Sequence, residues 1–506
     1  MPLSPDPALC RALAADLRDA GFTADALRTA WGGSADAAIS RGLRGPAERA
    51  LACRTDALAV LARFFVLGLV QPATTLTDAL PRTTVAGLVA LDLAAAEEGG
   101  IVAPRALIRP QEFVDAAGDM QWWIASDLDE AALGGPLPEG HVLGVGGASL
   151  TLAGLQLPGH VGRVLDVGTG CGIQALRARR DADHVVATDI SSRALFFTEL
   201  NAALNGVDGI EVRHGSLFAP VAGERFDRVV SNPPFVITPR AAGVPAYEYR
   251  DGGLVGDALV ARFVGGVGGH LAPGGVAQLL GNWEYREGQD GLDRVRQWVA
   301  ASDIPLDAWV VEREMLDPLE YAELWIRDGG TTPGSPAFAS LVAAWLDDFA
   351  ARGVTAVGFG YVLLRRPTAG APTLARYERL VQAVPAPLGP HLQAALSAHD
   401  RLQPLDDAGL AASVLVVAGD VTEARHHLPG AEAPSVVELR QGGGFGRTLE
   451  VDPALAGLVG ACDGDLPVGV LIDAIAELLE VDAGALREDL LPRVRELLFT
   501  GFLAFA

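Results

Sequence analysis

The chain of 506 residues contains no lysine, so all 39 of its basic residues are arginine; we attribute this to genomic base composition rather than to function. The 63 acidic residues outnumber them and give a formal net charge of −24, with a pI near 4.7. A protein that binds nucleic-acid backbones usually presents a basic field. The charge balance therefore lowers the expectation of a nucleic-acid partner, although a local arginine patch is compatible with it.

Cysteine is scarce, and its spacing argues against a zinc site. The four cysteines are Cys10, Cys53, Cys171 and Cys462, which lie far apart without a CxxC or Cys/His spacing. We therefore expect no metal, and we interpret the cysteines as reduced thiols of a cytoplasmic protein.

Long apolar runs are also missing. The most apolar stretch, Ala57–Val70, carries Arg63 and falls short of the ~20 residues that span a bilayer, so we expect a buried helix there. The first residues lack a basic segment followed by an apolar run, and no secretory signal is expected. We expect a cytoplasmic location and no membrane partner.

The hydrophobic content of 50% allows large cores, and the pattern along the chain suggests three domains. Residues 1–135 have apolar positions at helical spacing and are expected to be mainly helical. The stretch from residue 75 to 110 reads as helix, turn, helix and a pair of strands. This order suits a winged-helix module, and a helical cap that packs on the next domain is an equal alternative.

Residues 136–370 alternate strand and helix signals, which predicts a parallel sheet covered by helices. Helices are expected at 171–180 and 191–206, the second with Ser191 as N-cap and Gly206 past its end. Strands are expected at 163–168, 184–189, 210–215, 226–231, 275–283, 305–314 and 356–366, with an insertion between the last two. Residues 371–506 form the third region, an α+β domain whose end is again compatible with a winged helix.

A glycine-rich loop follows the first of these strands. It reads LDVGTGCG, from Leu165 to Gly172, so the strand delivers Asp166 to its carboxyl end. The glycines allow a close approach of the backbone to a ligand, and the amides at the start of the next helix point towards it. Ligands of open α/β sheets bind outside the carboxyl ends of the strands.

The acidic residues around this loop indicate which ligand it takes. The GxGxG spacing differs from the dinucleotide fingerprint, and Asp166 would repel a pyrophosphate but suits an ammonium and a sulfonium. Asp189 ends the second strand, where its carboxylate can accept both ribose hydroxyls of a nucleoside. Together they favour S-adenosyl-L-methionine over NAD.

A second motif, Asn232-Pro233-Pro234-Phe235, follows the fourth strand. The prolines hold the backbone rigid. The side-chain oxygen of Asn232 and a proline carbonyl can accept two hydrogen bonds from a planar NH₂ group, and Phe235 can stack on its flat face. Such orientation contributes up to roughly 7–11 kcal/mol in well-aligned systems. We call this motif the clamp, because it would hold the NH₂ group. A rigid turn is the structural alternative, but the position of the motif at the end of this strand favours the clamp.

These motifs carry a resemblance. Their order and spacing resemble those of class I S-adenosylmethionine-dependent methyltransferases. The segments that match are VLDVGTGCG, ATDIS, NAALNG and FDRVVSNPPF. More narrowly, residues 142–283 are similar to the small methyltransferase domain with an NPP[FY] motif. That group includes HemK-type enzymes, which methylate release-factor glutamine on N5, and ribosomal-RNA and adenine N-methyltransferases. The resemblance implies an α/β fold with a Rossmann-like sheet, flanked by the two terminal domains.

The resemblance also implies roles for individual residues. Ser216 stands where relatives often use an acid near the adenine, and the segment 142–155 is expected to flank the cofactor, with Thr151 as a candidate contact. The catalytic residues would be Asn232, Pro233 and Phe235. The acceptor would be bound by Pro234, Tyr247, Tyr249 and Arg250, the last three on a loop for which a solvated surface loop is the alternative. The cofactor would be bound by Asp166, Gly168, Thr169, Gly170, Gly172, Asp189, Ser216, Leu217 and Asn232.

The expected activity is methyl transfer to a planar NH₂ nitrogen of a macromolecule. A protein glutamine amide leads, because the charge is acidic and because a Gly-Gly segment follows the clamp, as in HemK-type enzymes. An exocyclic amine of a nucleobase in RNA or DNA is close behind, because winged helices often bind nucleic acid. A non-catalytic scaffold with a degenerate methyltransferase fold is the third alternative.

Overall fold

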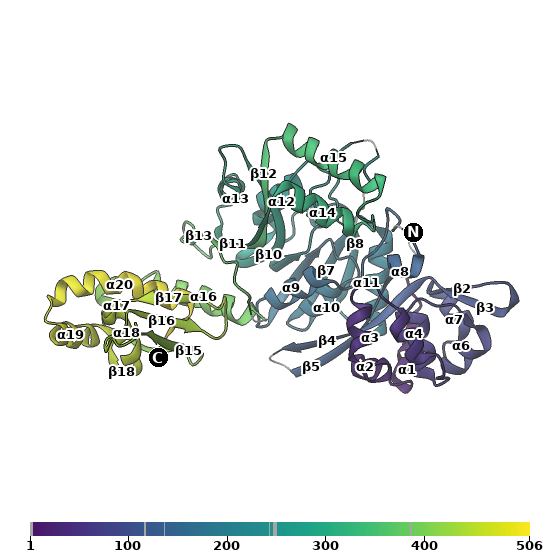
Figure 1. The fold of residues 1–506 in the computed structure, drawn as a ribbon, viewed down its shortest axis with the longest axis horizontal. Coiled ribbons are helices and arrows are strands. Elements are labelled where there is room, and N and C mark those ends of the chain that lie inside the picture. The colour runs from purple at the N-terminus through teal and green to yellow at the C-terminus, as the bar shows by residue number, and fades with distance from the viewer. Residues whose placement is uncertain (1–3, 116–117, 136, 242, 246–249, 385–386) are drawn as a thin grey trace. The chain divides into compact units, whose positions relative to one another are not determined.

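The computed structural model describes residues 4–115, 118–135, 137–241, 243–245, 250–384 and 387–506 (Figure 1). The chain divides into two compact units. The first contains Met1–Ala153 and His160–Glu378, and the second contains Gly154–Gly159 and Arg379–Ala506. The three-domain division at residues 135 and 370 stays a prediction. Among the described residues, none of the helices combines the length and the apolar character that crossing a bilayer requires.

The first unit begins with short helices that pack around a common core. They are α1 (Pro7–Asp19), α2 (Ala24–Trp31), α3 (Gly33–Ile39), α4 (Gly45–Leu51), α5 (Ala57–Leu61) and the π-helical turn η1 (Ala62–Val66). The stretch expected to be a buried helix contains α5 and η1, and its Phe64 and Phe65 are fully buried. The apolar core to which they belong continues into α10 and α11 of the next segment.

The expected order of two helices and two strands is present after η1. The elements are β1 (Gln71–Pro72), α6 (Ala73–Ala79), α7 (Thr84–Ala90), β2 (Ala94–Ala96), η2 (Glu98–Gly100) and β3 (Ile101–Pro104). β3 lies between β1 and β2 and pairs antiparallel with both. The assignment of this stretch to a winged-helix module stays a prediction.

A long hairpin comes next in the chain. It was not predicted, because residues 1–135 were expected to be mainly helical. β4 (Ala106–Asp115) pairs antiparallel with β5 (Gly118–Asp127), and the short helix α8 (Glu130–Leu133) comes next. Pro110 and the polar residues after it weaken the strand pattern in the sequence. The hairpin forms because Ile108, Trp122 and Ile124 bury their side chains in the core of the N-terminal helices.

The centre of the first unit is a sheet of eight strands (Figure 1). Its order is β13-β11-β12-β10-β9-β6-β7-β8. The strands are β6 (Val161–Val167), β7 (Ala182–Asp189), β8 (Ile210–His214), β9 (Phe226–Ser231), β10 (Leu271–Arg286), β11 (Asp307–Leu316), β12 (Val354–Arg365) and β13 (Ala375–Arg379). The five strands from β6 to β10 pair with one another in parallel, as expected.

The expectation of a wholly parallel sheet was wrong at β12. This strand lies between β10 and β11 and is antiparallel to both. The chain leaves β11 through α14 (Pro318–Asp328) and α15 (Pro336–Ala351), which pack against each other and return it at the same end of the sheet. Because β12 starts beside the end of β11, it must run in the opposite direction.

The remaining elements of the first unit connect the strands and form the rest of the core. They are α9 (Gly147–Leu155), α10 (Ile173–Arg179), α11 (Ser192–Leu204), η3 (Ala219–Val221), α12 (Ala258–Val267), η4 (Gly268–His270) and α13 (Gly291–Ala300). Ser191 caps α11 as expected, because its hydroxyl accepts a hydrogen bond from the Ala194 amide. Phe263 of α12 packs with Leu165, Val229 and Leu279 of the sheet.

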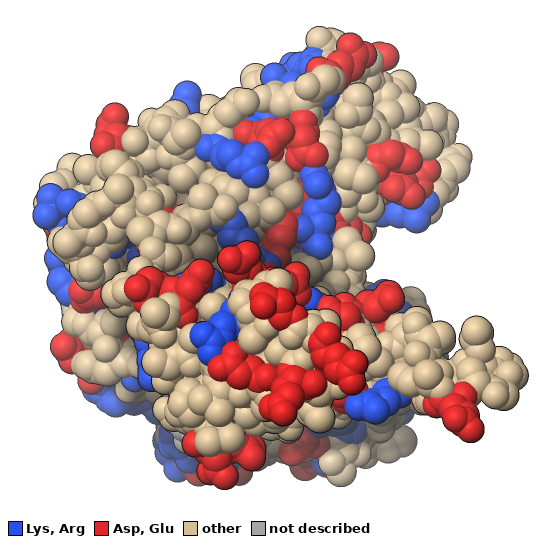
Figure 2. All heavy atoms as spheres, turned by 90° about the vertical axis from the view of Figure 1, so that its left-hand side faces the viewer, with Lys and Arg blue, Asp and Glu red and all other residues tan. Residues whose placement is uncertain are grey.

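The second unit has the expected α+β composition and its own core. Its helices are α16 (Gly389–Leu402), α17 (Asp407–Ala411), α18 (Pro453–Ala461), α19 (Val468–Leu479) and α20 (Ala483–Thr500). Its strands are β14 (Val414–Val417), β15 (Val421–His426), β16 (Val436–Gln441), β17 (Thr448–Val451), β18 (Asp463–Pro467) and β19 (Leu503–Phe505). They form two sheets with the orders β18-β14-β19 and β15-β16-β17. Acidic side chains are frequent on the face of the molecule that Figure 2 shows.

Candidate active site

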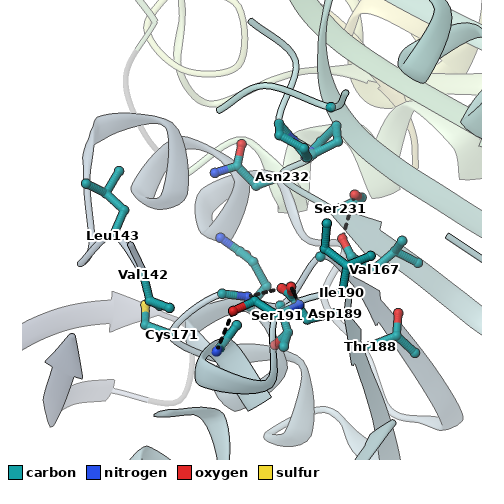
Figure 3. A pocket seen from close by; sticks show the side chains of 18 of the residues that line it. Val142, Leu143, Val167, Cys171, Thr188, Asp189, Ile190, Ser191, Ser231 and Asn232 are labelled. Carbon is teal, nitrogen blue, oxygen red and sulfur yellow. Dashed lines mark hydrogen bonds between the residues drawn. The ribbon is translucent and has the colours of Figure 1, made fainter. Parts of the chain in front are cut away.

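A cavity opens at the carboxyl ends of β6, β7 and β9, where a topological crossover places ligand sites in open α/β sheets. Six segments that are distant in sequence contribute to its wall (Figure 3). The lining residues are His141–Gly144, Ser149, Val167–Cys171, Ile173, Gln174, Thr188–Ser191, Ala194, Gly215–Leu217, Ser231–Pro234, Asp251, Gly252 and Leu259.

The glycines of the loop after β6 have two different functions. Gly168 and Gly170 line the cavity with φ angles of +73° and +55°, and a Cβ at either position would meet no atom within 4 Å. Gly172 does not line the cavity. There a Cβ would lie 3.0 Å from the Thr198 Cα, so this glycine permits the close packing of α11.

Asp166 lies beneath this loop, fully buried, and is not part of the cavity wall. Its Oδ2 accepts a hydrogen bond of 2.7 Å from the Thr169 hydroxyl. Its Oδ1 has no hydrogen-bond partner in the described part of the chain. Burial, supported by the charge of Asp189 and opposed by the hydrogen bond from Thr169, raises the pKa of this carboxyl to about 7. A buried acceptor without a donor is what a ligand ammonium would satisfy.

Asp189 lines the cavity at the end of β7 (Figure 3). Its carboxylate accepts a hydrogen bond of 3.0 Å from the Gly170 amide and one of 2.8 Å from the Ser191 amide. A carboxylate has roughly four acceptor positions, so it can still receive ribose hydroxyls. Ile190 follows with 52% of its side chain exposed in the cavity wall and offers an apolar surface beside them.

The segment after β8 completes this side of the cavity. Ser216 and Leu217 line it, as expected for neighbours of an adenine. The Gly215 amide donates to the Asp189 carbonyl at 2.9 Å, which fixes the segment to the end of β7. Leu217 has a φ of +48°, a conformation that non-glycine residues rarely adopt. Such strain is found where surrounding structure imposes a functional geometry.

Asn232 lies across the cavity from Asp189, directly after β9 (Figure 3). The Ser231 hydroxyl donates to the Val167 carbonyl at 2.7 Å and thereby joins the ends of β9 and β6. The Asn232 Nδ2 donates to the Ser149 hydroxyl at 3.5 Å, while the buried Oδ1 has no partner among the described residues. Pro233 and Pro234 also line the cavity. The structure therefore brings the clamp and the ribose-binding acid to one site.

Phe235 is not brought to the cavity. Its ring packs 5.4 Å from the ring of Phe359 and 6.3 Å from that of Trp325, measured between centroids. A short antiparallel bridge to Asp251 holds its backbone, so the side chain turns towards α14. The role of Phe235 in stacking on an acceptor stays a prediction that this arrangement does not support.

The loop expected to bind the acceptor is only partly described. Tyr247 and Tyr249 lie outside the described residues. Arg250 is buried away from the cavity, where its guanidinium donates to the Trp325 carbonyl at 2.8 Å and to Asp328 at 2.9 Å. Asp251 and Gly252 line the cavity instead. The Asp251 carboxylate is held by Arg240 and by the Gly253 amide.

Sequence reasoning missed several residues of the wall. Ser149, not Thr151, is the cavity residue of α9, and its carbonyl accepts a hydrogen bond of 2.7 Å from Gln174 Nε2. His141 is buried, and that burial lowers the pKa of its imidazole. The position of segment 142–155 before β6 identified the region but not the residues. Leu259 of α12 had no local signal at all.

These residues fit S-adenosyl-L-methionine. The unpaired oxygen of Asp166 suits its ammonium, Asp189 suits its ribose hydroxyls, and Ile190 and Leu217 offer apolar surface to its adenine. The residues of this site therefore agree with the cofactor that the sequence predicted.

Comparison with known protein families also indicates a methyltransferase domain in this part of the chain. Residues 146–244 match the family described as "Methyltransferase small domain". Residues 19–104 and 396–505 match families described as "Domain of unknown function", DUF7059 and DUF7782.

Individual relatives are similar over the same segment. A release factor glutamine methyltransferase of Xylella fastidiosa is 35% identical over 130 residues, which is 24% of this chain and 47% of that protein. One of Deinococcus radiodurans is 40% identical over 129 residues, 23% of this chain and 44% of that protein. A ribosomal protein uL3 glutamine methyltransferase of Bradyrhizobium diazoefficiens is 34% identical over 151 residues, 28% of this chain and 46% of that protein.

Residues 146–244 are therefore part of a class I S-adenosylmethionine-dependent methyltransferase domain. The segment matches the methyltransferase small domain and, as the motifs predicted, it is similar to HemK-like glutamine methyltransferases. The chain spans about half the length of the curated relatives it matches. Among solved structures, the ribosomal protein L11 methylase of Lactobacillus delbrueckii subsp. bulgaricus is 21% identical, over 44% of this chain and 76% of that chain. Its TM-score is 0.24, and no argument rests on this likeness.

Proposed function

We propose that the protein transfers the methyl group of S-adenosyl-L-methionine to the side-chain amide nitrogen of a glutamine in another protein. One observation carries this proposal. The Oδ1 of Asn232 is buried without a hydrogen-bond partner in the described residues, and Asn232 lines the same cavity as Asp189. An unsatisfied buried acceptor beside a cofactor site needs a donor from a second ligand.

The chain's own residues contribute orientation. Asn232 Oδ1 and the Pro233 carbonyl can accept the two N–H donors of a planar NH₂ group, which turns its nitrogen towards the glycine loop. When bound, S-adenosyl-L-methionine supplies an electrophilic methyl group on a sulfonium. A nitrogen–carbon bond then forms, the sulfur–carbon bond breaks, and the sulfur retains that electron pair. The surplus proton leaves the nitrogen after the transfer, so no strong general base is required.

The cavity favours a protein acceptor. None of its lining residues in the described part of the chain is an arginine, and the only charged side chains are the two carboxylates, Asp189 and Asp251. A phosphate backbone would meet repulsion there, whereas a neutral amide would not. Relatives of the matched segment are named as methyltransferases of glutamine in a release factor or a ribosomal protein. The partner is therefore a protein that presents a glutamine on an accessible loop.

A nucleobase amine is the second candidate acceptor. The observation in its favour is the order of helices and strands between residues 71 and 104, which is compatible with a nucleic-acid-binding module. A catalytically inactive scaffold is disfavoured because Asn232, Pro233, Pro234 and Asp189 all line one cavity.

Transfer of a labelled methyl group into a cell extract tests the acceptor. We expect protease, and not nuclease, to release the label from macromolecules. Acid hydrolysis of the protein fraction should then yield labelled methylamine, because an N-methyl amide is cleaved at its carbonyl–nitrogen bond. A parallel reaction with Asn232→Ala controls for background. Label released by nuclease alone would establish the nucleobase, and label that stays on an amino acid after acid hydrolysis would exclude the amide.

A further inference from the structure

Helix α19 of the second unit has apolar residues on two faces, and only one of them is covered. Val468, Leu471, Ile472 and Ala476 are buried in the core of this unit. A helix on the surface of a globular protein normally carries a single apolar stripe, and one that is apolar on more sides is normally covered on those sides as well.

The second apolar face is the outer stripe, which we define as Val470, Ala474 and Leu478. The helical repeat aligns these residues, and all three are exposed, Leu478 to 82%. Leu466, Leu479 and Val481, which are close to the outer stripe in sequence, are exposed as well. Scattered apolar side chains on a surface need no explanation, but an aligned group marks an interaction site.

An acidic row is defined as Asp473 and Glu477 of α19 and Glu480, the residue directly after the end of this helix. All three side chains are exposed, and Asp473 is paired with Arg487. In the described part of the chain, Glu477 and Glu480 form no ion pair.

The charge of the row selects among the possible occupants. A second copy of this chain would bring two acidic rows together across the shared apolar stripes, which like-charge repulsion disfavours. The anionic surface of a membrane would repel the same carboxylates. A helix that carries an apolar stripe with a basic row beside it satisfies both features at once.

We propose that α19 docks an amphipathic helix with a basic flank, supplied by a partner protein. The outer stripe takes the apolar residues of that helix, and Glu477 and Glu480 pair with its lysines or arginines. This surface is independent of the methyltransferase cavity, because it belongs to the second unit and shares no residue with the cavity wall.

Binding of a synthetic helical peptide to the full chain tests the proposal. The peptide has leucines at helical spacing and a row of lysines beside them, and a matched peptide has glutamates in place of the lysines. We expect the lysine peptide to bind the wild type in a salt-dependent manner and to bind Leu478→Ser about tenfold more weakly. Leu428→Ser, which alters an apolar residue of the same unit that is 65% exposed, should leave its affinity unchanged.

Three results would overturn the proposal. The first is equal affinity of the lysine peptide for the wild type and Leu478→Ser, or equal affinity of the two peptides for the wild type. The second is self-association of the wild type in sedimentation that Leu478→Ser abolishes, which would make a second copy the occupant. The third is flotation with phosphatidylcholine vesicles that is lost in Leu478→Ser, which would assign the stripe to lipid.

Discussion

At the scale of single residues, two buried oxygens distinguish this site from a rigid turn. Asp166 Oδ1 and Asn232 Oδ1 have no partner among the described residues, although each belongs to a side chain whose other polar atom is hydrogen-bonded. A buried acceptor without a donor costs about 1–3 kcal/mol of stability. Asn232 lines the cavity and Asp166 lies beneath its glycine loop, and both oxygens are consistent with donors that arrive with the ligands.

Ser149 positions Asn232, because its hydroxyl accepts the amide hydrogen and leaves Oδ1 for the acceptor. We expect Ser149→Ala to lower kcat about tenfold, as loss of an orienting contact does. The KM for S-adenosyl-L-methionine should change little. Ser149→Thr, which retains a hydroxyl, should recover most of the rate, and Thr151→Ala is the control on the same helix. A loss that appears only in KM would show that Ser149 binds the cofactor rather than orienting Asn232.

The carboxyl of Asp166 should make cofactor affinity depend on pH. Its pKa is about 7 in the folded chain, because burial disfavours the charge. An unfolded aspartate has a pKa near 4, so the free energy of unfolding falls as the pH rises between about 4 and 7. A bound ammonium stabilises the carboxylate, so affinity should increase by up to about tenfold per pH unit below 7 and then level off.

Calorimetry measures both effects. Titrations in two buffers of different ionisation enthalpy should show that binding below pH 7 releases a proton. Asp166→Asn removes the titrating group and should remove this proton release together with the pH dependence. Proton release that persists in Asp166→Asn would assign it to another residue.

At the scale of elements, Asn201 of α11 and Asn205, which directly follows α11, join this helix to the hairpin. Asn201 donates to the Ala125 carbonyl at 2.9 Å and to the Cys171 carbonyl at 2.8 Å, and its Oδ1 accepts from the Ala125 amide at 2.7 Å. Asn205 bonds the Trp123 amide and carbonyl in the same manner. The two side chains thus pair with β5 as a neighbouring strand would, and Asn201 also holds the glycine loop.

Asn201→Ala should therefore destabilise the first unit and disturb the cofactor loop. The substitution leaves the buried Ala125 amide and two carbonyls unpaired, which costs about 2–4 kcal/mol. Amide hydrogen exchange should increase in β5 and in residues 168–172. Asn205→Ala is the matched control, since it removes a comparable pairing without a contact to the loop. Faster exchange confined to α11 itself would contradict the proposed link.

Local patterns predicted the elements whose signals are contained within a few residues. The cap at Ser191, the loop after β6 and the strand before Asn232 all belong to this group. The hairpin of β4 and β5 was missed because its stability depends on partners that are distant in sequence, namely the core of the N-terminal helices together with Asn201 and Asn205. The direction of β12 depended on where α14 and α15 return the chain, which no local pattern encodes.

The same distinction holds within the site. Asp189 and Asn232 were predictable because each ends a strand, and the ends of parallel strands meet at one edge of a sheet. Ser149 and Leu259 reach the cavity through packing between elements. Phe235 was expected at the cavity from its motif, but α14 of the insertion provides the apolar surface that it covers instead.

At the scale of the whole molecule, each compact unit has a core of its own. The first contains the cores around α11 and around the central sheet, and the second contains a separate cluster that includes Leu415, Leu458, Ile472 and Val494. Units with separate cores can unfold in separate transitions.

Scanning calorimetry of the full chain should resolve two unfolding transitions. S-adenosyl-L-methionine should raise the midpoint temperature of only one of them. The cofactor cavity is lined by residues of the first unit alone, and a ligand at about 100 times its Kd adds about 2.7 kcal/mol to the state that binds it. The transition of the second unit should not move. A single transition, or an equal shift of both, would show that the units unfold together.

The most direct test of the proposed chemistry compares binding and turnover in Asn232→Ala. Asp189 and the glycine loop are unchanged in this variant, so calorimetry should give a Kd for S-adenosyl-L-methionine within about threefold of the wild type, a difference of less than about 1 kcal/mol. Transfer of labelled methyl into the protein acceptor should fall by at least about a hundredfold, because the amide nitrogen loses its oriented acceptor. Unchanged turnover with intact cofactor binding would contradict the account.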